Sequence, residues 1–180
     1  MKTTLAATSL SLALLFAAPP SFAQDPAESR AQIEAVIETF RKAIVEKDVA
    51  SFMPLFLRED ISWVGVYTDG SVERYHARLK DPKAPRPPRS FSSTPRRFIE
   101  NIARSTDSRA ETFSNVRIDT DGDVAQVWFD YSYLIGDYRN NWGKESWQMV
   151  RTETGWKIAG VAWSMEENPV PRPPRAAGAQ

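Results

Sequence analysis

The spacing of apolar residues changes once along this chain, and that change limits its fold more than any other feature does. Between Ile33 and Ile44 apolar residues recur every three or four positions, which is the period of an α-helix with one buried face. Between Glu111 and Met165 β-branched and aromatic residues form short runs separated by turn residues, as in antiparallel strands. Helices first and strands afterwards indicate an α+β domain.

Three segments begin with helix start signals. Each opens with Asp or Thr, whose side chain can accept a hydrogen bond from a free backbone N–H, and two of them continue with proline. The predicted helices cover residues 26–46, 49–57 and 95–105. Pro54 lies inside the second helix and is expected to bend or shorten it.

Five segments have the composition of strands. They are residues 61–67, 112–119, 124–135, 144–152 and 156–165. Asp121-Gly122 predicts a tight hairpin turn between the second and the third of them. Residues 72–93 are charged and rich in proline, so we expect a long surface loop there, and residues 136–143 are expected to form a polar connection.

The first 23 residues have the three regions of a secretory signal peptide. Lys2 supplies the positive start, residues 4–18 are apolar, and small residues lead up to Ala23. A membrane anchor, the alternative, would need roughly 20 apolar residues, and Pro19-Pro20 ends this stretch too early. We therefore expect cleavage between Ala23 and Gln24 and an exported protein, periplasmic or secreted, without a stable membrane anchor.

Cleavage would leave about 157 residues, the length of one ordinary domain. We expect that domain over residues 24–167, followed by a disordered tail over residues 168–180 that is rich in proline and arginine. The sequence Pro-Arg-Pro-Pro-Arg occurs at residues 85–89 and again at 171–175. Both copies should be stiff, extended and basic, either as plain solvated segments or as contacts to an anionic surface.

The composition excludes several classes of protein. Lys plus Arg and Asp plus Glu each number 23, so the chain has no basic excess for nucleic-acid binding. With no cysteine, an exported domain has no disulfides and depends on packing, for which six Trp, nine Phe and five Tyr are present. His76 is the sole histidine and is expected in a surface loop, and the Asp-rich residues 119–123 are better explained as a turn than as a calcium loop. We predict no metal and no cofactor.

Several of these elements together resemble the nuclear transport factor 2-like (NTF2-like, SnoaL-like) superfamily. The resemblance rests on Phe40 and Ala43 in the first helix, the Lys47-Asp48 turn, Leu55-Phe56, and the closing residues 155–160 with Trp163-Ser164. It implies a cone, in which three N-terminal helices pack on a strongly curved, mostly antiparallel sheet around a pocket. It also implies that a homodimer forms through the sheet.

Enzymes of this superfamily, such as isomerases, dehydratases and polyketide cyclases, tend to place a carboxylate or histidine on the first or the closing strand. Here residues 63–66 read Trp-Val-Gly-Val and residues 160–163 read Gly-Val-Ala-Trp, without an acid or base. Asp130 is the remaining candidate for a general base, because an acid within an apolar strand faces either water or a pocket.

Aromatic residues on the predicted strands favour a binding pocket, although they could equally fill the core. They are Trp63, Tyr67, Trp128, Tyr131, Tyr133, Trp147 and Trp163. The favoured hypothesis is an exported NTF2-like domain that binds a small apolar or aromatic ligand, or a protein partner, without catalysis. The alternative is an isomerase, dehydratase or cyclase that uses Asp130 as its general base.

Overall fold

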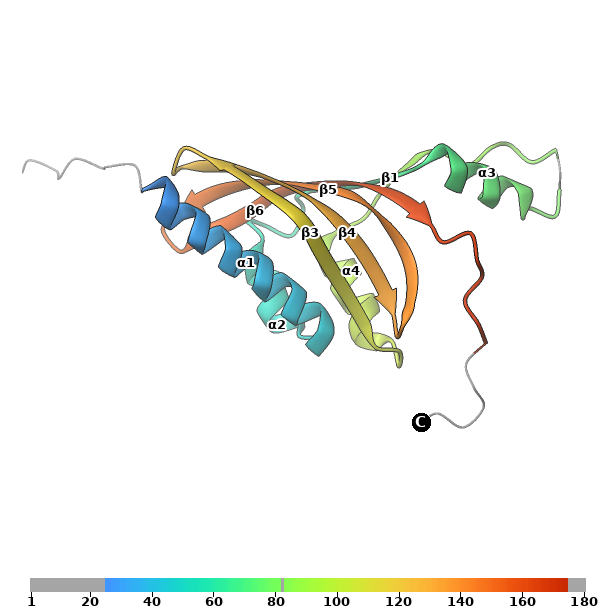
Figure 1. Ribbon diagram of the computed structural model, residues 1–180, viewed down its shortest axis with the longest axis horizontal. Helices are drawn as coiled ribbons and strands as arrows, with labels where there is room; N and C mark the ends of the chain where they lie inside the picture. The colour runs from blue at the N-terminus through green and yellow to red at the C-terminus, as the bar shows by residue number, and fades with distance from the viewer. Residues whose placement is uncertain (1–24, 82, 175–180) are drawn as a thin grey trace, which may run out of the picture.

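The computed structural model describes residues 25–81 and 83–174 (Figure 1). The predicted signal peptide and its cleavage site lie outside the described residues. Six strands form one sheet in the order β2-β1-β6-β5-β4-β3. They are β1 Ser62–Tyr67, β2 Ser90–Ser92, β3 Arg109–Thr120, β4 Val124–Ile135, β5 Tyr138–Thr152 and β6 Gly155–Glu167. Neighbouring strands are antiparallel except β1 and β6, which are parallel.

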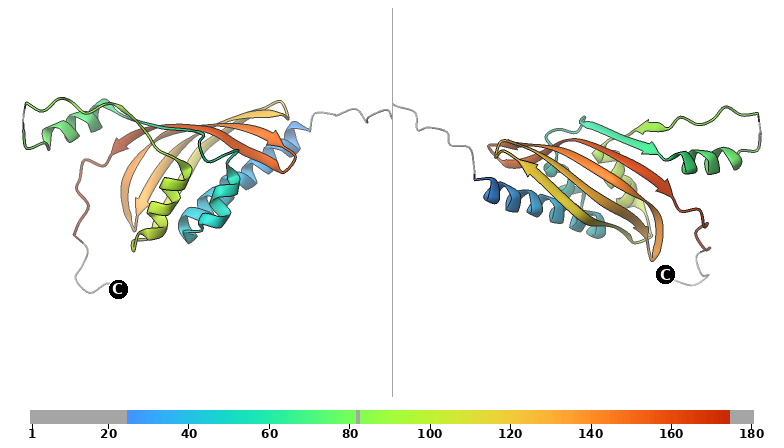
Figure 2. Two further views of the ribbon diagram at one scale, coloured as in Figure 1. Left: turned by 180° about the vertical axis from the view of Figure 1, so that it is seen from behind. Right: turned by 45° about the horizontal axis from the view of Figure 1, so that its top comes forward.

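The helices of the described chain are α1 Pro26–Glu46, α2 Val49–Phe52, α3 Asp69–Ala77 and α4 Pro95–Arg104. Figures 1 and 2 show α1, α2 and α4 along the concave side of the curved sheet, whereas α3 projects beyond one end of it. The predicted α+β fold, with helices packed on a strongly curved and mostly antiparallel sheet, is confirmed. None of the helices in the described residues is long and apolar enough to cross a membrane.

The predicted helix starts are the observed ones. Each cap side chain accepts a hydrogen bond from a backbone N–H of its first turn, at 2.9 to 3.1 Å, and the caps are Asp25, Asp48 and Thr94. The second helix is shorter than predicted because Pro54 cannot continue the α-helical hydrogen bonds, and Met53–Leu55 forms a 3-10 turn instead.

The prediction of a loop over residues 72–93 is wrong for two parts of that segment. The Thr68 hydroxyl accepts a hydrogen bond from the Ser71 N–H at 3.2 Å, so Thr68 caps α3, which begins at Asp69. Further on, β2 pairs with β1 and sets Phe91 opposite Gly65. A Cβ atom at position 65 would lie 2.3 Å from the Phe91 ring, so glycine is what allows the ring to cross the strand.

The polar connection predicted over residues 136–143 is also wrong. Only Gly136 and Asp137 form the turn, and β5 begins at Tyr138. Gly136 adopts a φ of 60°, which a tight hairpin turn requires and which glycine accepts without strain. The polar residues that follow extend β5 because they pair along β4, where Tyr133 lies opposite Asn141.

Aromatic rings fill the space between α1 and the sheet. The ring of Phe40 on α1 lies 4.9 Å, centroid to centroid, from both Phe52 and Trp147. Trp147 in turn meets Phe129 edge-on at 5.2 Å, and all four side chains are fully buried. In a chain without cysteine, this cluster supplies much of the packing that stabilises the domain.

The tail that we expected to be disordered begins at Asn168, and its described part, residues 168–174, lies against the domain. The Tyr138 hydroxyl donates a hydrogen bond to the backbone oxygen of Val170 at 2.7 Å. Arg172 donates to both carboxylate oxygens of Asp107, at 2.8 and 3.0 Å. These residues form no helix or strand, but their contacts hold them on the surface of the domain.

Candidate functional site

A cavity of about 320 Å³ lies between α4 and the concave face of the sheet. Aromatic rings form much of its wall, among them Trp63, Phe91, Phe98, Tyr131, Tyr133 and Trp163. Polar side chains also line it, and they are Ser93, Asn101, Arg109, Glu111, Asn141 and Glu145. A volume of this order suits a small organic ligand, because such pockets start at roughly 300 Å³.

Glu145 on β5 points from the sheet into this cavity. It lies opposite Phe129 on β4 and Trp163 on β6, so it occupies the concave face, and it is only 5% exposed. Its carboxylate accepts a hydrogen bond from the Trp147 indole N–H at 2.6 Å. Burial raises the pKa of Glu145 to about 7, although the indole hydrogen bond opposes that shift. Glu145 can therefore both take up and release a proton near neutral pH.

Glu111 on β3 is the second buried carboxyl group of the cavity and is 6% exposed. Burial and then the negative charge of Glu145 raise the pKa of Glu111 well above its usual value of 4.5. Within the described chain no side chain donates a hydrogen bond to Glu111 as Trp147 does to Glu145. Both carboxyl groups of the cavity therefore have raised pKa values, and the charge of Glu145 favours the protonated form of Glu111.

Tyr131 on β4 lies on the cavity wall between the strands that carry Glu111 and Glu145. Its hydroxyl donates a hydrogen bond to the Ser164 backbone oxygen at 3.0 Å. Burial and the charges of both glutamates raise the pKa of Tyr131, so it stays protonated. On the same strand, burial raises the pKa of Tyr133 against the opposing charge of Arg109. Both phenols are thus neutral groups in a cavity that carries two carboxyl groups.

The aromatic residues predicted to form the pocket fall in different places. Trp63, Tyr131, Tyr133 and Trp163 line the cavity. Tyr67 lies in a smaller neighbouring cavity beside Phe91, and Trp147 is wholly buried in the core. Trp128 is 46% exposed on the convex face, because it follows Val127 and strand residues alternate between faces.

Asp130, the predicted candidate base, lies on the opposite face of β4 from Tyr131 and does not line the cavity. Its carboxylate pairs with Lys144 and accepts a hydrogen bond from the Asn115 amide at 2.6 Å. These two partners hold the pKa of Asp130 below its usual value, the opposite of what a base near neutral pH needs. Asp130 is a partly exposed, ion-paired residue on the convex face.

Glu111 and Glu145 line the pocket, and neither was among the candidate residues named from the sequence. Both lie at strand positions other than the two that the family resemblance emphasises. The signal was present in the alternation of β5, where Glu145 shares a face with Trp147 and Met149. A glutamate two residues before a buried tryptophan on a strand is expected to be buried as well.

His76 belongs to α3 and not to a loop, and its Nε2 lies 2.9 Å from the backbone oxygen of Ala84. It is remote from the residues that line the cavity. Among the described residues, no three histidine or acidic side chains are grouped closely enough to hold a metal ion.

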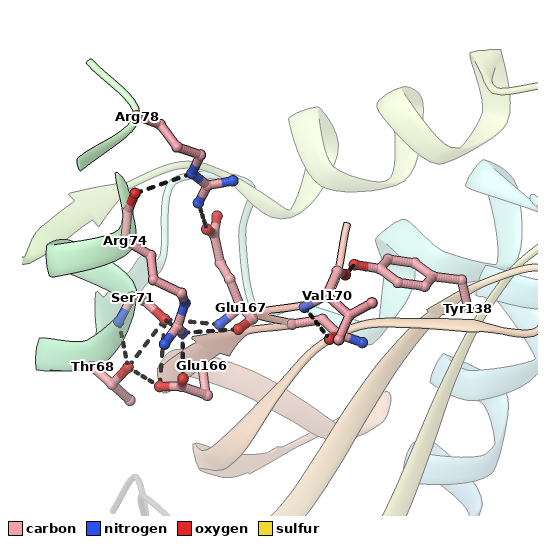
Figure 3. A network of polar contacts seen from close by, with 9 residues as sticks. Thr68, Ser71, Arg74, Arg78, Tyr138, Glu166, Glu167 and Val170 are labelled. Atoms are coloured by element: carbon pink, nitrogen blue, oxygen red, sulfur yellow. Dashed lines mark hydrogen bonds and ion pairs between the residues drawn. The ribbon is translucent and has the colours of Figure 1, made fainter. Parts of the chain in front are cut away.

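A second polar cluster joins α3 to the end of β6 (Figure 3). Glu166 accepts hydrogen bonds from the Thr68 hydroxyl and from Arg74. Arg74 also donates to the backbone oxygen of Glu167 at 2.9 Å, and the Ser71 hydroxyl accepts from the Glu167 N–H at 2.8 Å. Every carboxylate oxygen of Glu166 therefore has a donor, so this cluster positions α3.

Comparisons with known proteins identify the fold. The chain matches no protein-family model, and no curated protein matches it. A proposed aromatic ring hydroxylase of Novosphingobium aromaticivorans is 17% identical with a TM-score of 0.53, over 81% of this chain and 96% of that one. An NTF2-like protein of unknown function from Shewanella baltica is 11% identical with a TM-score of 0.54, over 81% and 99%.

A further NTF2-like protein with a cystatin-like fold, also from Novosphingobium aromaticivorans, is 12% identical with a TM-score of 0.53, over 77% of this chain and 82% of that one. Identities this low establish the fold and nothing about activity. The chain has the NTF2-like, or cystatin-like, fold that its sequence resemblance implies.

Proposed function

We propose that this protein is a general acid–base enzyme that moves a proton on a small, mostly apolar substrate held in the cavity. One observation carries the proposal: Glu111 and Glu145 are both buried in the wall of the same aromatic cavity. Buried carboxyl groups are unfavourable for stability unless they are paired, and neither glutamate has an ion-pair partner among the described residues. Groups of this kind with displaced pKa values are typical of catalytic sites.

The two glutamates have complementary states at neutral pH. Glu145 has a pKa of about 7, so a substantial fraction is carboxylate and can accept a proton. The raised pKa of Glu111 favours its protonated form, which can donate a hydrogen bond. A pair with one base and one acid supports proton transfer at carbon without any further group.

The simplest reaction begins at a carbon next to a substrate carbonyl. The Glu145 carboxylate takes a proton from that carbon, the C–H electron pair moves into the new enolate, and the Glu111 carboxyl donates a hydrogen bond to the enolate oxygen. If the substrate has a carbon–carbon double bond next to that carbon, the electron pair spreads over it as a dienolate, and Glu145 returns its proton to the far carbon of the double bond, which completes an isomerisation. If a hydroxyl group leaves the neighbouring carbon, the same proton leaves with it as water and the reaction is a dehydration.

Deuterium exchange tests this proposal without knowledge of the natural substrate. Small ketones that contain an aromatic ring, such as acetophenone and 2-tetralone, are incubated with the protein in D₂O, and loss of their α-proton signals is followed by NMR. We expect exchange to be about 100-fold slower in Glu145→Gln, since general base catalysis contributes at least about that factor. Asp130→Asn is the matched control and should exchange at the wild-type rate.

Two results would contradict the proposal. Wild-type protein that accelerates exchange of none of these ketones has no accessible base in the cavity. Equal rates in the wild type and in Glu145→Gln, with a loss in Asp130→Asn, would move the chemistry to the convex face.

Export remains part of the proposed function. It is supported by the signal-like residues 1–23. Mass spectrometry of the protein recovered from a periplasmic or culture-medium fraction should find an N-terminus at Gln24, and an intact N-terminus at Met1 would contradict export.

A homodimer through the convex face of the sheet is likewise proposed. It is supported by large apolar side chains that are exposed there, Val124 at 55% and Trp128 at 46%. Light scattering should give twice the chain mass, and Trp128→Glu should give the monomer. A monomeric wild type would contradict it.

A further inference from the structure

The wall of the cavity is divided between an apolar and a polar side. The strand order places β2, β1 and β6 on one side of the sheet and β5, β4 and β3 on the other. The apolar side carries Phe91, Trp63 and Trp163, and the Trp163 ring lies 5.5 Å from Trp63 and 5.6 Å from Phe91, centroid to centroid. The polar side carries Arg109 and Glu111. A ligand that fills the cavity must therefore be apolar at one end and polar at the other.

Arg109 lines the polar side and brings a permanent positive charge to it, because a guanidinium does not lose its proton in a protein. Its side chain is 18% exposed. Its Nε and one terminal nitrogen donate to the Ser105 hydroxyl at 3.2 and 3.0 Å, which sets its orientation without placing a negative charge beside it. No ion pair joins Arg109 to Glu111 in the described part of the chain.

The nearest carboxylate to Arg109 is already engaged by another arginine. Asp107 lies 3.7 Å from Arg109, beyond hydrogen-bond distance, while it accepts from Arg172 through both oxygens at 2.8 and 3.0 Å. Among the described residues, two guanidinium groups thus share the single negative charge of Asp107. Arg172 belongs to the second Pro-Arg-Pro-Pro-Arg sequence. Because Arg172 binds both oxygens of Asp107, Arg109 is able to pair with an anion in the cavity.

We propose that the cavity selects a small aromatic carboxylic acid, whose ring lies among Trp63, Phe91 and Trp163 and whose carboxylate pairs with Arg109. Arginine matches a carboxylate through two parallel hydrogen bonds, and pairing is favoured at a largely buried position. The volume of about 320 Å³ limits the ligand to one or two rings. This inference deepens the proposed function, since it names the substrate class of that same site.

Binding of matched probes tests the inference. Calorimetry compares 2-naphthoate with its neutral isostere 2-naphthamide and with acetate, which has the charge but no ring. We expect wild-type protein to bind 2-naphthoate at least tenfold more tightly than either of the others, because a charge-assisted hydrogen bond is about twice as strong as a neutral one. Arg109→Gln should remove the preference for the acid over the amide.

Two further variants separate charge recognition from loss of fold. Arg109→Lys keeps the positive charge and should retain part of the preference for 2-naphthoate. Arg117→Gln removes an exposed arginine from the same strand, outside the cavity, and should retain all of it. Equal binding of acid and amide, no binding of either, or a preference that survives Arg109→Gln would overturn the inference.

These outcomes are distinct from those of the exchange experiment. If the amide binds as tightly as the acid while Glu145→Gln still abolishes exchange, the substrate class is wrong and the acid–base function stands. If 2-naphthoate binds through Arg109 while exchange is the same with and without Glu145, the binding inference stands and the acid–base function fails.

Discussion

Two glutamates on neighbouring strands of this sheet, Glu145 on β5 and Glu166 on β6, have opposite electrostatic environments. Burial on its own favours the protonated form, and so a higher pKa, at both residues. At Glu166 the hydrogen bonds from Thr68 and Arg74 outweigh burial and bring the pKa below its usual value (Figure 3). At Glu145 the indole N–H of Trp147 is the one opposing contact, and the pKa rises to about 7.

The difference separates a structural carboxylate from a functional one. Glu166 is ionised, paired with Arg74 and used to fasten α3 to the end of the sheet. Glu145 and Glu111 face open space in the cavity, where no described cation pairs with either of them. A protein gains no stability from such a pair, so the arrangement is best explained by chemistry performed on a ligand.

The substitution Glu145→Gln should have the largest effect, because it should stabilise the protein at high pH. The folded-state pKa of about 7 exceeds the usual value of 4.5, so the folded protein binds more protons than the unfolded one between these values. Stability therefore falls as pH rises from about 4.5 to about 7 and then levels off. The variant lacks that loss and should gain about 3 kcal/mol in free energy of unfolding at pH 8, measured in urea.

The control for that measurement is the same urea unfolding experiment at pH 4. At pH 4 the wild-type carboxyl is protonated in both states, so the gain in Glu145→Gln should vanish. A gain that is equal at pH 4 and pH 8, or a loss at pH 8, would contradict an elevated pKa.

Arg74→Ala should have the next largest effect, in the opposite direction. It leaves Glu166 half-buried without its cation, and since the pair is 31% and 25% exposed, we expect a loss of about 1 to 2 kcal/mol. The loss should decrease as pH falls and Glu166 is protonated, because its pairing contributes only when it is ionised. Limited proteolysis should cleave within residues 69–89 of this variant first.

Arg78→Ala is the matched control for that variant. Arg78 pairs with Glu167 at 2.8 Å, but its side chain is 64% exposed, so water screens the pair. Its urea midpoint should be close to that of the wild type. Equal losses of stability in the two variants would show that the Arg74–Glu166 pair contributes no more than the exposed Arg78–Glu167 pair.

Asp130→Asn should have the smallest effect. The Asp130–Lys144 pair lies on the convex face, away from the residues that line the cavity. Thermal unfolding and binding of 2-naphthoate should both be unchanged. A weakened affinity for the probe would show that the convex face contributes to the site.

Much of the fold could be predicted from the sequence, because its signals are local. Asp25, Asp48 and Thr94 cap helices through contacts two or three residues away, and Asp121-Gly122 closes a hairpin between neighbouring strands. The helix α3 was missed although Thr68 caps it locally; its attachment to the sheet through Arg74 and Glu166 joins residues that are 92 positions apart. No local pattern reveals such a pair.

The candidate site was predicted less well, for the same reason. Alternation showed that each strand has two faces but did not say which face of β4 is concave, so Trp128 and Asp130 were considered alongside Tyr131. The strand pairing settles that question by placing Glu145 opposite Phe129 and Trp163. The displaced pKa values follow from burial and from groups on other strands, neither of which is visible in a single segment.

The most direct test of this account is a ¹³C NMR titration of the glutamate side-chain carboxyls, with Glu111, Glu145 and Glu166 assigned by substitution with glutamine. The account predicts that Glu145 titrates near pH 7, that Glu111 also titrates well above 4.5, and that Glu166 titrates below 4.5. Titration of all three between pH 4 and 5 would contradict it, because the cavity would then hold two ordinary carboxylates and no acid–base pair.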